Sequence, residues 1–147
     1  MKQLTSEDRF NVACITPGNP NCPKNPGGDF DIGAPPILSK LKDGKSPLVV
    51  GQKSAVAYGL DPDEKGKIVW QTRIGKGGPL GGIEFGGAAD QKSVYFPLSD
   101  CAVDPKAGGG MFALEIATGK KLWETAPAPP ACLLSRDAAP RNLRPPR

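Results

Sequence analysis

Short apolar runs alternate with turns that contain glycine or proline along most of residues 36–125. The runs are too short for helices, and their spacing is typical of β-strands. Turns such as KDGK, PDEKG and ATGK separate them. The pattern therefore predicts an all-β fold with two sets of four strands. The first set is Pro36–Leu41, Pro47–Gly51, Ala55–Leu60 and Lys67–Arg73, and the second is Gly82–Gly86, Ser93–Leu98, Gly110–Glu115 and Lys121–Thr125.

The last two strands of each set resemble each other. Val56–Thr72 and Gly110–Thr125 both contain an aromatic residue, a leucine, an acidic residue, a glycine turn with lysine, and a tryptophan followed by a threonine. Trp70 and Trp123 lie 53 residues apart. A repeat of four strands is typical of a β-propeller blade. We expect the tryptophans to occupy equivalent places and to fill the gap between neighbouring blades. An ordinary core tryptophan in a β-sandwich is the alternative.

The repeat divides the chain into four parts. Residues 1–35 are predicted to be an irregular N-terminal segment, residues 36–75 and 76–126 two blades of a partial β-propeller, and residues 127–147 a disordered tail. The tail is rich in proline, alanine and arginine, which also fits a shifted reading frame. Propellers typically need four to eight blades, so we expect missing blades from a longer chain. No apolar run is long enough to span a membrane, and the N-terminus has charges where an export signal needs an apolar stretch.

Composition excludes several classes of function. The net charge is +4, but most of the excess lies in the arginine-rich tail, so the predicted blades have no basic stripe for nucleic acid. The absence of histidine excludes Ser-His-Asp and Cys-His catalysis and a C-x-x-C-H haem site.

The four cysteines, Cys14, Cys22, Cys101 and Cys132, form no C-x-x-C pair, which argues against structural zinc. Cys14 and Cys22 flank a short loop, and a local disulfide is favoured over free thiols.

Four stretches resemble the pyrroloquinoline-quinone-dependent dehydrogenases, and within them the polyvinyl-alcohol dehydrogenase branch. They are DFDIGAPPIL, VVGQKSAVAYGLDPDEKGKIVWQT, GKGGPLGGIEFGGAAD and GGGMFALEIATGKKLW, and the resemblance extends from Asn11 to Thr125. It implies a quinoprotein β-propeller of eight four-stranded blades, with the quinone in the central funnel beside a calcium ion. It also implies a periplasmic location, a small-molecule or polymeric alcohol as substrate, and cytochrome c as a possible electron acceptor.

The resemblance assigns roles to four residues. Asp31, in Phe30-Asp31-Ile32-Gly33, matches the catalytic aspartate of the family and is the implied calcium ligand. Lys53 matches the cation that contacts the quinone carbonyls. Glu84 and Phe85 lie where the family has an aromatic residue near the cofactor, although the branch more often has tryptophan at Phe85. The family's other calcium ligands, a glutamate and an asparagine from earlier blades, have no counterpart here.

Simpler interpretations of the same residues remain. Aspartate is a common turn residue, so Asp29 and Asp31 could form only a solvated turn, and Lys53 could be an ordinary lysine at a hairpin tip. We therefore consider three hypotheses. The chain is part of a quinoprotein alcohol dehydrogenase that is inactive alone, a non-catalytic propeller segment that serves as a protein-binding scaffold, or the inactive product of a truncated or frameshifted gene.

Overall fold

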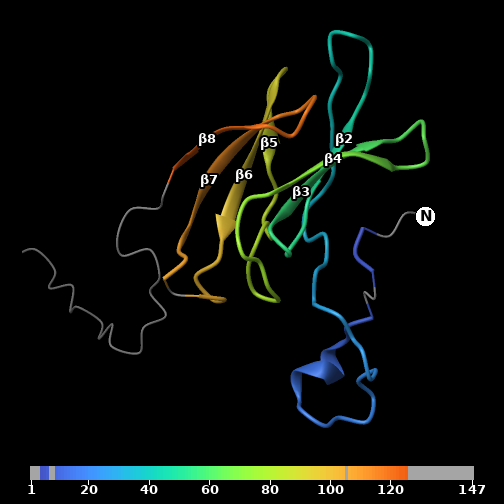
Figure 1. The fold of residues 1–147 in the computed structure, drawn as a ribbon, viewed down its shortest axis with the longest axis vertical. Coiled ribbons are helices and arrows are strands. Elements are labelled where there is room, and N and C mark those ends of the chain that lie inside the picture. Colours follow the sequence, from blue (N-terminus) through green and yellow to red (C-terminus); the bar gives the residue numbers. More distant parts are fainter. Residues whose placement is uncertain (1–3, 7–8, 105, 126–147) are drawn as a thin grey trace, which may run out of the picture.

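The fold consists of two four-stranded antiparallel sheets that lie side by side (Figure 1). The computed structural model describes residues 4–6, 9–104 and 106–125. The prediction of an all-β, partial-propeller fold is confirmed, and the single helix of the described residues is a short 3-10 turn, η1 (Val12–Ile15). The first sheet contains β1 (Ile37–Leu38), β2 (Leu48–Gly51), β3 (Val56–Asp61) and β4 (Lys67–Arg73). The second contains β5 (Ala88–Ala89), β6 (Ser93–Ser99), β7 (Gly109–Glu115) and β8 (Lys121–Thr125).

The two sheets repeat one another in strand order and in register. Each is a meander in which consecutive strands pair, and the last pair of each contains an irregularity at the same point. In the first sheet Gly59 pairs with Trp70 directly before the register shifts. In the second, Ala113 pairs with Trp123 directly before the shift. The two tryptophans are therefore in equivalent places, as the repeat predicts.

Trp70 fills the space between the sheets. Only 8% of its surface is exposed, and it belongs to the main core with Val49 and Ala57 of its own sheet. The second sheet contributes Val94, Phe96, Phe112 and Leu114 to this core. The indole Nε1–H of Trp70 donates to the carbonyl oxygen of Ile116 at 2.8 Å, across the gap between the sheets. The gap-filling role predicted for the tryptophan is thus confirmed at Trp70.

Trp123 occupies the equivalent place on a face that the described residues leave open. It is 44% exposed, and it contacts Tyr95 with ring centroids 5.8 Å apart. Leu122 and Met111 nearby are also exposed. The difference between the two tryptophans follows from their surroundings, because the second sheet covers Trp70 and no described element does the same for Trp123.

One predicted strand, Gly82–Gly86, is wrong. The first strand of the second sheet is instead β5, Ala88–Ala89. Gly82 has a φ of +76°, outside the β region, and forms only an isolated bridge with Ser99. Ile83 then turns toward the first sheet, where it is fully buried and donates its N–H to the carbonyl oxygen of Gln52 at 3.2 Å. This segment therefore joins the two sheets rather than starting the second one.

The N-terminal segment runs away from the sheets and contains η1 (Figure 1). A disulfide joins Cys14 to Cys22, which confirms the predicted local pairing. Nearer the start of the chain, Leu4 packs against the second core, formed by Val50, Val56, Tyr58 and Leu60 on the other face of the first sheet. No helix among the described residues is long and apolar enough to cross a membrane. The predicted tail, residues 127–147, lies outside the described residues.

Candidate functional site

The candidate site forms around the tight hairpin between β2 and β3. The N–H of Ala55 donates to the carbonyl oxygen of Gln52 at 2.9 Å, and the N–H of Gln52 donates to Val56 at 3.1 Å. Ala55 has a φ of 61°, the left-handed conformation that commonly closes three-residue hairpins. This geometry places Lys53 at the tip of the turn, two residues after the end of β2.

A network of hydrogen bonds around the buried side chain of Gln52 supports the hairpin. The Gln52 side chain accepts hydrogen bonds from Ser54 Oγ at 2.6 Å and from Tyr58 Oη at 3.3 Å, and it donates to Thr5 Oγ1 at 2.9 Å. Buried polar groups of this kind fix one conformation when each has a partner. No buried side-chain nitrogen or oxygen of the described residues lacks one. The turn that carries Lys53 is therefore well defined before any ligand binds.

Lys53 lies between two carboxylates. Its Nζ is 3.3 Å from Asp29 Oδ2 and 3.4 Å from Asp31 Oδ2. The side chains of Lys53 and Asp29 are 14% and 21% exposed, whereas that of Asp31 is 66% exposed. The main chains of the two segments are also hydrogen-bonded, since the N–H of Lys53 donates to the carbonyl oxygen of Asp31 at 3.1 Å. The structure thus brings together the two residues that sequence reasoning placed in the catalytic centre.

The pKa of Lys53 is raised above its ordinary value of 10.5. Burial is the largest single influence and acts to lower the pKa, because it disfavours the charged amine. The hydrogen bond and charge of Asp29, and then those of Asp31, together outweigh it. Lys53 is therefore held as a cation.

Asp29 is the member of this group that sequence reasoning assigned only to a turn. It is more buried than Asp31, and it is the first of the two carboxylates to raise the pKa of Lys53. The only signal available was the spacing of the two acidic residues around Phe30. In an extended segment, residues two apart point to the same side, and this arrangement allows both carboxylates to reach one amine.

Glu84 and Phe85 lie on the segment that joins the sheets, close to the main chain of the site. A Cβ placed on Gly33 would come within 2.8 Å of the carbonyl oxygen of Glu84, so the two backbones are in close contact. No hydrogen bond or ion pair among the described residues joins the Glu84 carboxylate to Asp31 or Lys53. Phe85 is 66% exposed. We call Lys53, Asp29 and Asp31 the charged group. The structure therefore brings the segment to the site but does not join the side chains of Glu84 and Phe85 to the charged group.

The charged group fits a quinone better than it fits a complete calcium shell. A fixed ammonium can donate to a carbonyl oxygen and stabilise negative charge that develops there. Calcium takes six to eight oxygen ligands, whereas the described residues contain no group of three or more side chains placed to hold a metal. Asp29 and Asp31 supply carboxylates, but the Lys53 amine already lies between them.

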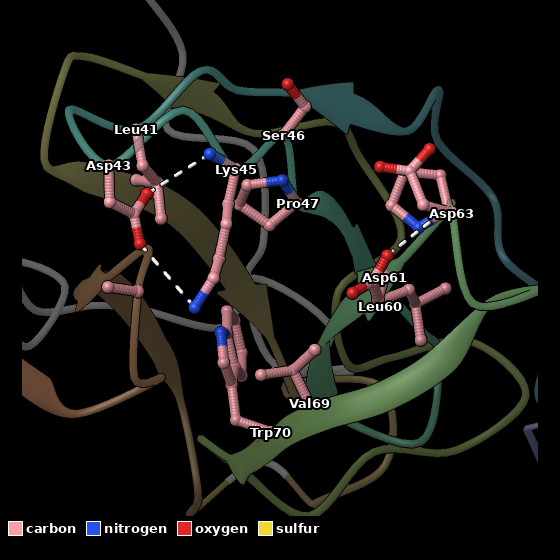
Figure 2. Close-up of a pocket in the computed structure, with 12 residues that line it drawn as sticks. Leu41, Asp43, Lys45, Ser46, Pro47, Leu60, Asp61, Asp63, Val69 and Trp70 are labelled. Atoms are coloured by element: carbon pink, nitrogen blue, oxygen red, sulfur yellow. Dashed lines mark hydrogen bonds and ion pairs between the residues drawn. The ribbon is translucent and has the colours of Figure 1, made fainter.

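Another hollow lies at the opposite end of β2 (Figure 2). Leu41, Pro47, Leu60 and Val69 line it, together with Trp70. Its basic side chain, Lys45, pairs with Asp43 at 3.6 Å, and both are well exposed. The arrangement is that of a solvated turn over the edge of the core, and the charged group at Lys53 remains the better candidate for chemistry.

The fold is that of a propeller-type protein, because two consecutive blade-like sheets pack together around a tryptophan. The charged group of Lys53, Asp29 and Asp31 lies beside the segment that joins them. Comparison with known proteins makes the class more specific. The chain is 42% identical to a polyvinylalcohol dehydrogenase from Pseudomonas sp over 129 residues, and 46% identical to one from Sphingopyxis sp. (strain 113P3) over 131 residues. These alignments cover 88% and 86% of the chain but 20% of each relative.

The chain is therefore polyvinylalcohol-dehydrogenase-like, and it spans about one fifth of the length of the curated relatives that it matches. The family resemblance predicted from the sequence is confirmed over this segment. No family model matches the chain.

Proposed function

We propose that this chain forms part of a quinoprotein alcohol dehydrogenase and contributes a proton acceptor and a quinone contact to its active site. The observation that carries the proposal is the position of Lys53, whose amine lies within 3.4 Å of two carboxylates at the junction of the sheets. A scaffold has no evident need for a partly buried charged group at this place. The similarity to two polyvinylalcohol dehydrogenases supports the same class of reaction.

Asp31 is the proposed proton acceptor. Oxidation of an alcohol to a carbonyl compound removes a proton from the hydroxyl group and a hydride from the adjacent carbon. A carboxylate within hydrogen-bond reach of the hydroxyl can accept the proton. The exposed carboxylate of Asp31 can meet a substrate in this way, whereas the more buried Asp29 remains paired with Lys53.

Lys53 is the proposed contact to the cofactor. Pyrroloquinoline quinone, when bound, accepts the two electrons that leave the alcohol as hydride. An ammonium group beside a quinone oxygen favours that transfer, because it stabilises the negative charge that arises on the oxygen. Asp29 supports this role, since its carboxylate orients the amine.

The remaining parts of the site would come from elsewhere in a longer chain. Asp31 is a proposed calcium ligand, but the other ligands are not among the described residues, and we assign no step to calcium. Glu84 and Phe85 are proposed to border the cofactor. We also propose that further blades cover the face around Trp123, that the chain alone is inactive, and that electrons pass to an acceptor such as cytochrome c. The Cys14–Cys22 disulfide supports an oxidising compartment such as the periplasm.

The proposed quinone contact can be tested in a chimera in which this segment replaces its counterpart in the full-length Sphingopyxis relative. We expect Lys53→Ala to weaken binding of pyrroloquinoline quinone and to slow turnover. Lys45→Ala is the matched control, because Lys45 is also a turn lysine paired with an aspartate but lies at the other end of β2. Equal quinone affinity in the two variants would contradict the proposal.

A further inference from the structure

The carboxylate of Asp100 is buried and makes no contact with the charged group, yet its bonds converge on the same region. Asp100 directly follows β6 and is 1% exposed. Its Oδ2 accepts the N–H of Lys76 at 2.7 Å, and its Oδ1 accepts those of Gly77 at 3.0 Å and Gly82 at 3.1 Å. A buried carboxylate needs such partners, because burial without hydrogen bonds is costly. The side chain of Asp100 is therefore hydrogen-bonded to both ends of the loop 76–82.

The loop 76–82 is in direct contact with the main chain of Lys53. The N–H of Gly78 donates to the carbonyl oxygen of Lys53 at 2.9 Å. A Cβ placed on Gly82 would lie 2.0 Å from that same oxygen, so the loop and the hairpin touch without room for a side chain. On its other side, the N–H of Lys53 donates to Asp31. The backbone of Lys53 is thus held between the Asp31 segment and the loop.

We propose that Asp100 is a positioning residue that fixes Lys53 through the loop 76–82. The inference rests on the proposed function for its catalytic meaning, but the structural link to Lys53 can be tested without it. Asp100 itself is not placed to meet a substrate, because it is buried and its oxygens are occupied by main-chain donors. Its role is to keep the hairpin and the joining segment in register, so that the amine reaches Asp29 and Asp31.

Asp100→Asn tests this role, because it keeps the shape while replacing one acceptor oxygen with a donor that faces N–H groups. Asp90→Asn is the matched control. Asp90 lies before the opposite end of β6 and also accepts three hydrogen bonds, from the N–H groups of Lys92 and Ser93 and from Tyr95 Oη. None of these three partners belongs to the Lys53 hairpin or to the loop 76–82.

The first measurement is amide hydrogen exchange by NMR on the 147-residue chain. We expect Asp100→Asn to speed exchange at Gly78, Ile83 and Lys53 relative to the central amides of β3 and β4. Asp90→Asn should leave those three amides unchanged. If Asp100→Asn speeds exchange uniformly, or no more at Lys53 than Asp90→Asn does, Asp100 has only a general structural role and the inference is wrong.

The second measurement is the affinity of the chimera for pyrroloquinoline quinone. Loss of a residue that orients a metal ligand typically costs about 10-fold or more in affinity, and we expect a loss of that size for Asp100→Asn, because Asp100 orients Lys53, but not for Asp90→Asn. If Lys53→Ala leaves the affinity unchanged, the proposed function fails, while the exchange data still decide whether Asp100 holds Lys53. If Asp100→Asn does not fold, Gly82→Ala pushes the loop off the Lys53 carbonyl and should give the same local exchange pattern. Protection at Lys53 equal to that of the unmodified chain would then overturn the inference.

Discussion

Replacing Trp70 by phenylalanine should destabilise the fold much more than the same change at Trp123. The indole N–H of Trp70 satisfies the carbonyl oxygen of Ile116 at 2.8 Å in a nearly closed interior. Phenylalanine keeps most of the apolar contact but leaves that buried oxygen without its donor, which costs about 1–3 kcal/mol. Full truncation to alanine should cost about 3–5 kcal/mol.

Trp123→Phe is the natural control, because Trp123 has the equivalent register but is 44% exposed. An exposed substitution of this kind typically changes stability by about 0.5 kcal/mol or less, and the ring contact with Tyr95 can persist. The assay is urea unfolding followed by circular dichroism, with the slope compared between variants so that only the midpoint reports stability. Equal losses at the two positions would refute the view that Trp70 seals the two sheets together.

Three further predictions concern stability. Gly119→Ala should cost more than Gly44→Ala in the same unfolding assay, because both glycines have positive φ but only at Gly119 would a Cβ meet Trp70, at 2.4 Å; similar losses would mean that the ring can move aside. Because the pKa of Lys53 is raised above 10.5, its ion pairs should contribute fully below that pH and be lost as the pH rises through the folded-state value. The stability difference between the unmodified chain and Lys53→Met should therefore shrink in strong alkali, and a difference that shrinks only in acid would be inconsistent with this sign. Replacing Cys14 and Cys22 together by serine, which removes a bond of a kind that contributes about 2–3 kcal/mol in short loops, should speed amide exchange in residues 10–26. It should leave exchange in the sheets unchanged, since η1 buries no residue, and a matching change there would show that the segment supports the core.

The strands that were predicted well are those whose sequence pattern and local geometry agree. β2 to β4 and β6 to β8 lie within one residue of their predicted bounds, because alternating or continuous apolar runs end there at clear turn residues. The segment Gly82–Gly86 also alternates apolar residues, Ile83 and Phe85, but it is kept out of the sheet by a positive φ at Gly82 and by contacts with the hairpin of the other sheet. Such contacts join residues far apart in sequence, so no local pattern could have indicated them.

The same limit applies to the site. The family motif located Asp31 and Lys53, and the structure brings them together. It could not show that Asp29 is the more buried partner of the lysine, because that burial depends on how the N-terminal segment meets a hairpin 24 residues further along the chain. Nor could it indicate Asp100, whose three partners belong to a loop that is separated from it in sequence by β5 and β6.

The most direct test of the proposed function is the turnover number of the Asp31→Asn chimera with pyrroloquinoline quinone bound. Asparagine keeps the shape of the side chain but cannot accept the hydroxyl proton, so turnover should fall about 100-fold or more while the quinone remains bound. The fall should exceed that of Lys53→Ala, since other groups around the cofactor can still stabilise its oxygen. Near-normal turnover in Asp31→Asn would contradict the account, because Asp31 would then be only an exposed turn residue beside Lys53.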